Sequence, residues 1–453
     1  GIPWLKGLTW LRGFHGLISL CCVAMATYDM FMFVNAGSGG KTGERILETV
    51  KQPLYVKAAD GSMLNLRIFK LTPDDNPYPA GSKPGFQALR QTAAGRQTRV
   101  VVAGGDGTVK WILHELGAHR IPESGVMLGI LPLGTGNDFA QAMGWGATVP
   151  RSVETIGWEG TLKEMVPKWW SAPQRLLDVW TVHIEVDRDK GDVLHVDSKE
   201  RVGRRLDRVE LNEVMINYFS MGLDAQTGYG MDKHRTSSRL GNLCVYVWEG
   251  LKKTCPCRRV NRITDFIDSV YEGTSNQGRL IFSTFGDEDE PQLISKKPRL
   301  LVVCNISSYA GGTAHFWETG GRVGVDRPID PDLLKRESDP GDSKLELVTV
   351  RNVITLAADK VAGTLPFPIF GPKRIFQGAP LYVEFSEDDE DAKISFIQID
   401  GEFWKLVNPV SASVKLKQKV AVIHNSTPPE ANESDEDESE EENGFFTMLL
   451  GKK

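Results

Sequence analysis

Three hydrophobic stretches near the start of the chain each run into a glycine-rich turn and then into residues with helical spacing. They are FVNAGSGGKTG (33–43), VVAGGDGTVKWILHEL (101–116) and LPLGTGNDFA (131–140). Short runs of strongly apolar residues predict buried strands, and the apolar residues after the second turn recur at i, i+3, i+4 and i+7. Repetition of strand, turn and helix predicts an α/β layer whose turns lie at the carboxyl ends of the strands.

The second turn places one carboxylate, Asp106, among three glycines. Glycine lets the backbone approach a ligand closely, and a helix N-terminus favours negative charge, so this turn suits a phosphate group. Asp106 would repel a bare phosphate. Its position is explained if a cation lies between the two, or if the carboxylate positions a hydroxyl group or a water molecule. The alternative is an ordinary strand-to-helix turn in which Asp106 only caps the helix.

The other two turns have related chemistry. The first nearly matches the phosphate-loop pattern, but Asn35 stands where that pattern requires its first glycine, so the motif is rejected. Residues 38–41, Ser-Gly-Gly-Lys, can still bind phosphate through backbone amides and the lysine cation. The third turn supplies Asn137 and Asp138 as hydrogen-bonding groups. Three such turns from one sheet predict a shared nucleotide site.

Composition narrows the class of protein. The 453 residues are 41% hydrophobic and 25% charged, which is ordinary soluble composition with room for two domains. The net charge of −6 comes mainly from acids between residues 430 and 442, so the rest of the chain is close to neutral and carries no nucleic-acid footprint. The six cysteines show neither a disulfide framework nor zinc-ligand spacing, which favours a reducing, cytoplasmic setting.

The hydrophobic pattern divides the chain into four parts. Residues 1–29 are an apolar leader too short in its uninterrupted run to span a bilayer, and it is either an interfacial anchor or a packed leader. Residues 30–150 carry the three turns. Residues 151–424 contain strand-like segments without long amphipathic helices between them, which predicts an antiparallel second domain. Residues 425–453 form an acidic tail whose composition predicts disorder.

Taken as a set, the motifs closely resemble the diacylglycerol kinases, which use ATP to phosphorylate the free hydroxyl of diacylglycerol and give phosphatidic acid. The resemblance covers about residues 30–424. It implies an α/β nucleotide-binding domain followed by a mostly antiparallel β-sandwich-like accessory domain, with the active site in the cleft between them. It rests on NAGSGGKTG (35–43), GGDGTVKWILHEL (104–116), LPLGTGNDFAQAMGWG (131–146), NYFSMGLDAQTGYGMDKHR (217–235), NISSYAGGTAHFW (305–317) and IQIDGEFW (397–404).

Carried over position by position, the resemblance implies roles for particular residues. Asp106 and Asp138 match acids required for catalysis, Asp400 matches the base that takes the proton of the lipid hydroxyl, and Glu402 lies beside it. This chemistry is reasonable because phosphoryl transfer needs neutralised phosphates and an acceptor oxygen held in line. The residues implied to contact or position ATP and its magnesium are Asn35, Ser38, Gly39, Lys41, Gly104, Gly105, Asp106, Gly107, Thr108, Gly134, Thr135 and Asn137.

The chain departs from the family pattern in three places. Ala36 stands where a proline usually follows the first asparagine. Asp342-Ser343 replaces the Asp-Gly of the structural magnesium site seen in bacterial relatives, which would here use Asp342 and Glu346. The sequence also contains no paired His/Cys zinc module of the diacylglycerol-binding kind and no calcium loop.

Alternatives to this function stay open. One is a kinase for another lipid alcohol, such as ceramide or sphingosine, and the other is a lipid-binding pseudokinase. The turn at residues 134–138 and the NYFSMGLDA block favour diacylglycerol over the other lipids. Retention of Asp106, Asp138 and Asp400 argues against a pseudokinase.

The expected partner is diacylglycerol in a membrane, contacted peripherally by a cytoplasmic protein, since no apolar run reaches the roughly 20 residues that span a bilayer. Residues 364–376 set aromatic and aliphatic side chains around Lys373 and Arg374, which suits a membrane interface. A buried, proline-rich crossover is the alternative for this segment.

Overall fold

The computed structural model describes residues 27–71, 83–196, 203–206, 209–233, 262–284, 294, 298–312, 314–351, 371–386 and 393–427. The predictions for the leader before residue 27, for the acidic tail after residue 427 and for residues 364–370 lie outside the described residues.

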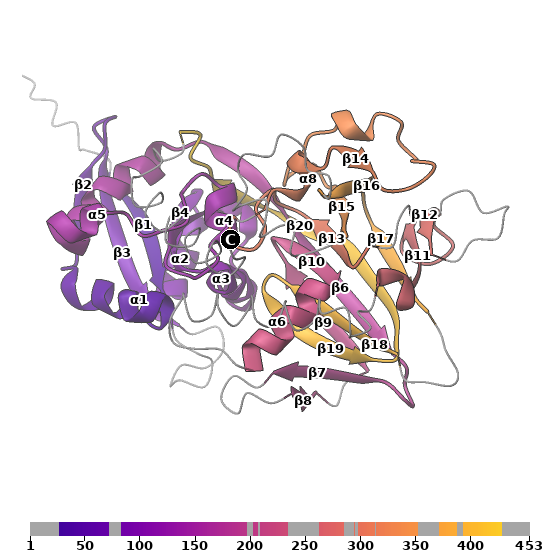
Figure 1. The fold of residues 1–453 in the computed structure, drawn as a ribbon. Helices are drawn as coiled ribbons and strands as arrows, with labels where there is room; N and C mark the ends of the chain where they lie inside the picture. Colours follow the sequence, from indigo (N-terminus) through magenta and orange to yellow (C-terminus); the bar gives the residue numbers. More distant parts are fainter. Residues whose placement is uncertain are drawn as a thin grey trace, which may run out of the picture.

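The first lobe is an α/β layer on a largely parallel sheet (Figure 1). Its strands lie in the order β5 (Val126–Pro132), β4 (Thr98–Gly104), β1 (Thr27–Val34), β3 (Met63–Lys70) and β2 (Leu54–Lys57). All of these pairings are parallel except that of β2, the edge strand, with β3. Every side chain of β5 is buried, as expected for a parallel strand covered on both faces.

Three helices begin at the three glycine-rich turns. Helix α1 (Ser38–Thr49) follows β1, α3 (Asp106–Ala118) follows β4, and α4 (Asp138–Ala142) follows β5. Because β1, β4 and β5 are neighbours in the parallel sheet, their carboxyl ends share one edge, and the three turns meet there as the sequence predicts. A further helix, α2 (Pro84–Ala93), starts with proline at its first position, where no backbone N–H is needed.

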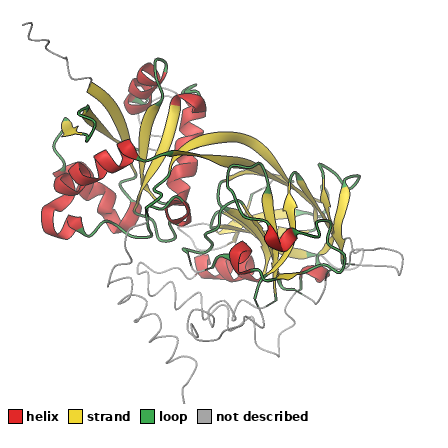
Figure 2. Ribbon diagram, turned by 90° about the horizontal axis from the view of Figure 1, so that it is seen from above, coloured by secondary structure: helices red, strands yellow, loops and turns green. Residues whose placement is uncertain are grey.

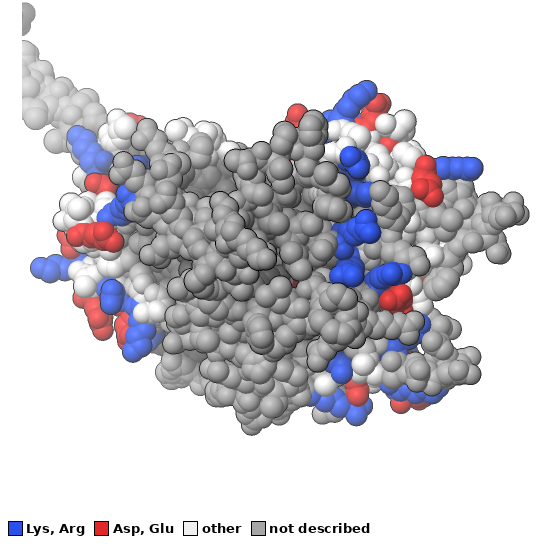
Figure 3. Space-filling model, viewed as in Figure 1, with Lys and Arg blue, Asp and Glu red and all other residues white. Residues whose placement is uncertain are grey.

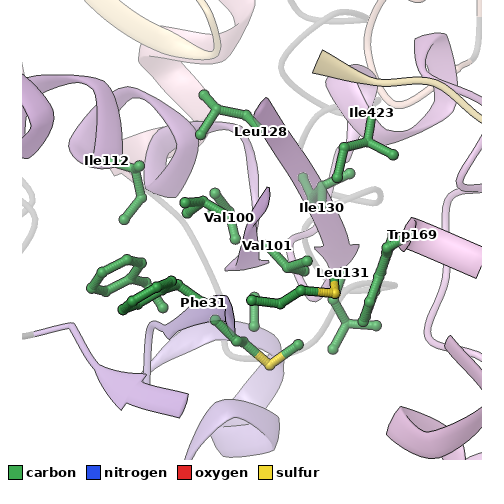
Figure 4. Packing of buried hydrophobic residues seen from close by; sticks show 14 of the residues in the cluster. Phe31, Val100, Val101, Ile112, Leu128, Ile130, Leu131, Trp169 and Ile423 are labelled. Carbon is green, nitrogen blue, oxygen red and sulfur yellow. The ribbon is translucent and has the colours of Figure 1, made fainter. Parts of the chain in front are cut away.

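Helix α5 (Ser152–Ser171) also packs on this lobe. Its Trp169 lies close to the sheet residues in Figure 4, within the same buried cluster as β1, β4 and β5. The sequence pattern places the start of the second domain at residue 151 and predicts no long helix after it. The buried residues of α5 do follow one helical stripe from Trp158 to Trp169, but Gly157, whose φ is 68° and where the helix bends, and Pro167 within the helix interrupt the pattern in the sequence.

The second lobe has two sheets facing one core (Figure 2). One sheet runs in the order β14-β16-β15-β13-β10-β18-β19-β7-β8, antiparallel except for β14 with β16. Strands β6, β9, β11, β12, β17 and β20 belong to the other sheet, which continues into the first lobe. The bounds are β6 (Gln174–Val186), β7 (Asp192–Val196), β8 (Gly203–Arg205), β9 (Glu210–Met215), β10 (Tyr218–Gly222), β11 (Ile267–Glu272), β12 (Arg279–Ser283), β13 (Leu300–Cys304), β14 (Arg322–Val323), β15 (Leu345–Val350), β16 (Lys373–Gly378), β17 (Leu381–Phe385), β18 (Ile394–Ile399), β19 (Glu402–Val407) and β20 (Pro409–Ile423), with helices α6 (Leu223–Lys233) and α8 (Phe316–Thr319). An α/β domain followed by a mostly antiparallel β domain is therefore confirmed.

The long strand β20 belongs to both lobes. It pairs antiparallel with β6 from Pro409 to Ile423, and one half also pairs with β17 of the second lobe. At its other end, Ala421 and Val422 pair in parallel with β5, and Ile423 packs in the first core (Figure 4). The Trp145 indole donates to the Ile423 carbonyl over 2.8 Å. The β6–β20 ribbon thus crosses from one lobe to the other and fixes how they meet.

The charged surface contributes little to this arrangement. On the face seen in Figure 3, described Lys and Arg side chains are interspersed with Asp and Glu. Ion pairs among the described residues include Arg205–Asp192 and Arg279–Glu272. Exposed pairs are worth only about 0–1 kcal/mol each, so the fold depends on its cores. Among the described helices, none has both the length and the apolar character needed to cross a bilayer.

Candidate active site at the lobe junction

The second and third glycine-rich turns touch through their backbones. A β-carbon placed on Gly105 would lie 2.9 Å from the Cα of Gly134, and one placed on Gly134 would lie 2.6 Å from the Cα of Gly105. Both distances are shorter than a real β-carbon contact allows, so only glycine fits at these positions. Asn35 of the first turn donates from Nδ2 to the Thr108 hydroxyl over 3.2 Å. The three turns therefore form one continuous surface.

The first turn has an unusual backbone. Gly39, Gly40 and Lys41 have φ values of 62°, 60° and 76°, three left-handed residues in succession. Glycine adopts this conformation without cost, whereas lysine pays roughly 1–2 kcal/mol. Such a turn can direct consecutive backbone amides toward an anion. The Lys41 side chain is 80% exposed, so its ammonium is accessible to a ligand.

Asp106 joins the second turn to the third. Its Oδ1 accepts from the Phe139 amide over 2.8 Å and its Oδ2 from the Asp138 amide over 3.2 Å, so it caps helix α4 rather than its own helix. Burial, and to a lesser extent the nearby Asp138 charge, raise the pKa of Asp106 to about 6. Because the Asn217 side chain also donates to this carboxylate, one of its four lone pairs remains for a cation.

Asp138 crosses the lobe junction. Its Oδ2 accepts from the Tyr218 hydroxyl over 3.0 Å and its Oδ1 from the Ser308 hydroxyl over 2.6 Å. The amides of Gly311 and Gly312 donate to the same carboxylate over 3.0 and 3.2 Å. Burial raises the pKa of Tyr218 well above its ordinary value, so the phenol stays protonated and donates. One carboxylate of the first lobe is thus surrounded by donors of the second.

Asp400 lies in the tight turn between β18 and β19, with a left-handed φ of 50°. Its side chain is fully buried. Oδ1 accepts from the amides of Asn217 and Tyr218 over 2.8 and 3.0 Å, and Oδ2 accepts from the amide of Ile216 over 2.9 Å. Burial raises the pKa of Asp400, and the Lys110 charge is the largest influence in the opposite direction. Glu402, by contrast, is half exposed.

Asn217 links these acids, and the sequence analysis did not single it out. A hydrogen bond from its side chain lowers the pKa of Asp106, and its backbone amide binds Asp400. Its Oδ1 is buried and has no hydrogen-bond donor among the described residues. Tyr218, Ser308 and Lys110 were also missed. All four lie inside the segments quoted for the resemblance, but nothing in their spacing distinguishes them from their neighbours.

Two of the expected nucleotide ligands have other contacts. The Asn137 side chain accepts from the Gly134 amide over 2.9 Å and donates to the carbonyls of Gly134 and Ala147 over 2.8 and 2.6 Å, so it locks its own turn. Thr108 is buried beside Gly104, where a β-carbon would lie 2.4 Å from the Thr108 hydroxyl. These residues shape the turns. Gly107 and Thr135 lie on the exposed side.

The structure gives less support to the predicted structural magnesium site at Asp342 and Glu346. Glu346 is fully buried, burial raises its pKa to about 8, and its Oε2 has no hydrogen-bond donor within the described part of the chain. Asp342 contributes to that increase, so the two carboxylates are near one another. However, Lys344 already pairs with Asp342 over 3.0 Å.

Similarity to known proteins agrees with this geometry. The family model described as "Diacylglycerol kinase catalytic domain" matches residues 29–166, and that described as "Diacylglycerol kinase accessory domain" matches residues 214–403. The two matches together cover well over half of the chain, which belongs to the diacylglycerol kinase family.

Curated relatives share the family name at modest identity. Diacylglycerol kinase 4 of Arabidopsis thaliana is 27% identical over 410 residues, covering 83% of this chain and 76% of the relative. Diacylglycerol kinase theta of Mus musculus is 28% identical over 399 residues, covering 85% of this chain and 33% of the relative. The eye-specific diacylglycerol kinase of Drosophila melanogaster is 29% identical over 315 residues, covering 68% of this chain and 18% of the relative.

The contact between Gly105 and Gly134 predicts that Gly105→Ala lowers the free energy of unfolding by roughly 1–3 kcal/mol, because the new methyl group forces the two turns apart. Gly105 has an extended backbone, φ −104° and ψ −170°, that alanine also adopts, so the effect is steric. Gly107→Ala is the matched control, since a β-carbon there meets nothing within 4 Å. Chemical denaturation without nucleotide measures both. Equal stability of the two variants would contradict the contact.

Proposed function

We propose that this protein is an ATP-dependent diacylglycerol kinase that transfers the terminal phosphoryl group of ATP to the free hydroxyl of diacylglycerol, giving phosphatidic acid. The observation that carries the proposal is the meeting of three glycine-rich turns with the Asp400 carboxylate at one lobe junction. Membership of the diacylglycerol kinase family supports it. The first lobe would hold the donor and the second would present the acceptor.

The three turns are the proposed nucleotide site. Backbone amides around Gly39 and Gly105 would bind phosphate oxygens, and the exposed Lys41 ammonium would add a positive charge. Asn35, Ser38, Gly104, Gly107, Thr108, Gly134, Thr135 and Asn137 would contact ATP or hold the turns in shape. Phosphoryl transfer depends mainly on this kind of positioning and charge neutralisation.

The described residues fit a magnesium ion bound together with the phosphates. Asp106 keeps one free lone pair, and the buried Asn217 Oδ1 has no donor among the described residues. Magnesium takes oxygen ligands, commonly one or two carboxylates completed by phosphate and water. Asp106 and Asn217 would hold the ion, which would supply neutralising charge. A second, structural magnesium at Asp342 and Glu346 stays a prediction.

Asp400 is the proposed general base. Oδ1 accepts two backbone hydrogen bonds, whereas Oδ2 accepts one, which leaves a lone pair on Oδ2 for the hydroxyl proton. As the hydroxyl oxygen bonds to the terminal phosphorus, the bond to ADP breaks and ADP leaves with the electron pair. The hydroxyl proton passes to Asp400. Glu402 lies 4.0 Å from the same Lys110 ammonium as Asp400, and Asp138 holds the two lobes in register.

The substrate makes membrane contact necessary, and we propose that this contact is peripheral and takes place from the cytoplasm. The apolar leader is one candidate surface. The other predicted surface, residues 364–376, is not supported in its described part, because Arg374 and Phe376 are buried in β16 and the Arg374 guanidinium donates to the Trp317 carbonyl over 2.8 Å, as a buried crossover predicts. Neither a nucleic-acid partner nor a protein partner enters this proposal.

The decisive assay incubates the purified chain with ATP and magnesium and a set of lipid alcohols in mixed micelles. We expect phosphatidic acid from diacylglycerol, and loss of product when magnesium is chelated. Faster phosphorylation of sphingosine or ceramide would establish the first alternative. Lipid binding without phosphorylation of any alcohol would establish a pseudokinase.

The raised pKa of Asp106, about 6, predicts a pH dependence of nucleotide binding. The carboxylate is ionised above this pH and can share a magnesium ion with the phosphates, so affinity for magnesium–ATP should fall as the pH drops below about 6. Asp106→Asn should bind weakly at every pH and lose this dependence. Isothermal titration of both proteins at matched pH separates the enzyme's titration from that of ATP. Parallel pH profiles would contradict a metal-linked role for Asp106.

A further inference from the structure

Lys110 places a buried ammonium group at the lobe junction. It lies on α3 four residues after Asp106, so the two side chains share one face of the helix. The side chain is only 11% exposed, and Nζ makes no hydrogen bond with any described residue. It is, however, 4.0 Å from Asp400 Oδ2 and 4.0 Å from Glu402 Oε1. A cation of the first lobe thus faces two carboxylates of the second.

Lys110 faces Oδ2 of Asp400, which is the oxygen proposed to accept the proton of the lipid hydroxyl. Oδ1 of Asp400 is occupied by two backbone amides, and Oδ2 by one. Lys110 lies on the side of Oδ2, whose remaining lone pair is proposed to accept the hydroxyl proton.

The other charges around Asp400 do not provide this cation. Asp106 of α3, Asp138 of α4 and Glu402 of β19 are acids, and Tyr218 of β10 is a protonated phenol. Among the described residues, Lys110 is the cation within ion-pair distance of Asp400. The Asp400 carboxylate therefore depends on Lys110 for its charge compensation.

We propose that Lys110 is a positioning residue for the phosphoryl transfer: its ammonium holds the Asp400–Glu402 turn of the second lobe against the nucleotide lobe. The proposal rests on the function proposed above. It assigns Lys110 no contact with ATP or lipid, because its ammonium lies between the two carboxylates.

The first part of the test is kinetic. Lys110→Met, which keeps the length but removes the charge, should lower kcat for diacylglycerol by up to about 10²-fold. Lys110→Arg should restore most of the rate, because it restores a positive charge between the Asp400 and Glu402 carboxylates. The dissociation constant for ATP should change little. Lys163→Met is the control, since that lysine pairs with Glu159 on the exposed side of α5.

The second part does not depend on activity. Lys110→Met, Asp400→Asn and the double variant form a cycle in which the midpoint of chemical denaturation is measured near neutral pH. The loss caused by Lys110→Met should be smaller when Asp400 is already neutral, because the lysine change then no longer leaves an unpaired buried charge.

The outcomes separate the two proposals. A Lys110→Arg variant as slow as Lys110→Met, or additive changes in the cycle, would overturn the role of Lys110. A loss of ATP affinity as large as the loss of kcat would overturn it too, because Lys110 would then contact phosphate. If wild-type protein phosphorylates no diacylglycerol while the cycle shows coupling, the proposed function fails and the Lys110–Asp400 pair stands.

Discussion

The carboxylate of Asp138 is the contact on which the geometry of the lobe junction depends. It belongs to the third glycine-rich turn of the first lobe, yet its hydrogen-bond donors come from β10 and from the segment after β13 in the second. Hydrogen bonds to a charged group are each worth about 1.5–3 kcal/mol, and an unsatisfied buried carboxylate is costly. Separation of the lobes would therefore leave the Asp138 carboxylate without these hydrogen-bond donors, so these hydrogen bonds keep the lobes in register.

Larger elements make that register possible. Strand β20 pairs with β6 along its length, with β17 at one end and with β5 at the other, so a single sheet runs through both lobes. The amide of Asn217 and that of Tyr218 reach Asp400, while the Asn217 side chain reaches Asp106. The start of β10 thus connects the proposed base of the second lobe with the proposed metal ligand of the first.

The sequence predicts those parts of this arrangement that depend on local chemistry. The strand–turn–helix units could be recognised because buried strands, glycines and helical spacing leave local patterns, and the parallel sheet then brings the turns to one edge. The antiparallel second half was predicted for the same reason. Helix α5 was missed because Gly157 and Pro167, both unfavourable within a helix, interrupt its pattern. The return of β20 to β5 joins segments almost 300 residues apart, Met127 and Ala421, without any local signal.

The contacts that assemble the site are equally non-local. Tyr218 and Ser308 are 80 and 170 residues from Asp138 along the chain, and their roles arise from strand register at the junction. Asn137 shows the converse, since the motif names it as a nucleotide ligand whereas its side-chain amide binds the backbone of its own turn at Gly134 and of Ala147 beyond α4. Residue type and position in a motif predict which segment acts, and the folded geometry distinguishes residues that face a ligand from those that shape the turn.

The central claim is that the two lobes divide the work, with ATP held by the first and the acceptor hydroxyl activated by the second. Asp400→Asn tests it most directly when kcat and the ATP dissociation constant are measured on the same protein. General-base help is typically worth about 10² to 10⁴ in rate, so kcat should fall within that range while ATP affinity stays within a few-fold of wild type. Loss of ATP binding in a folded Asp400→Asn variant would contradict this division and make Asp400 part of the nucleotide site.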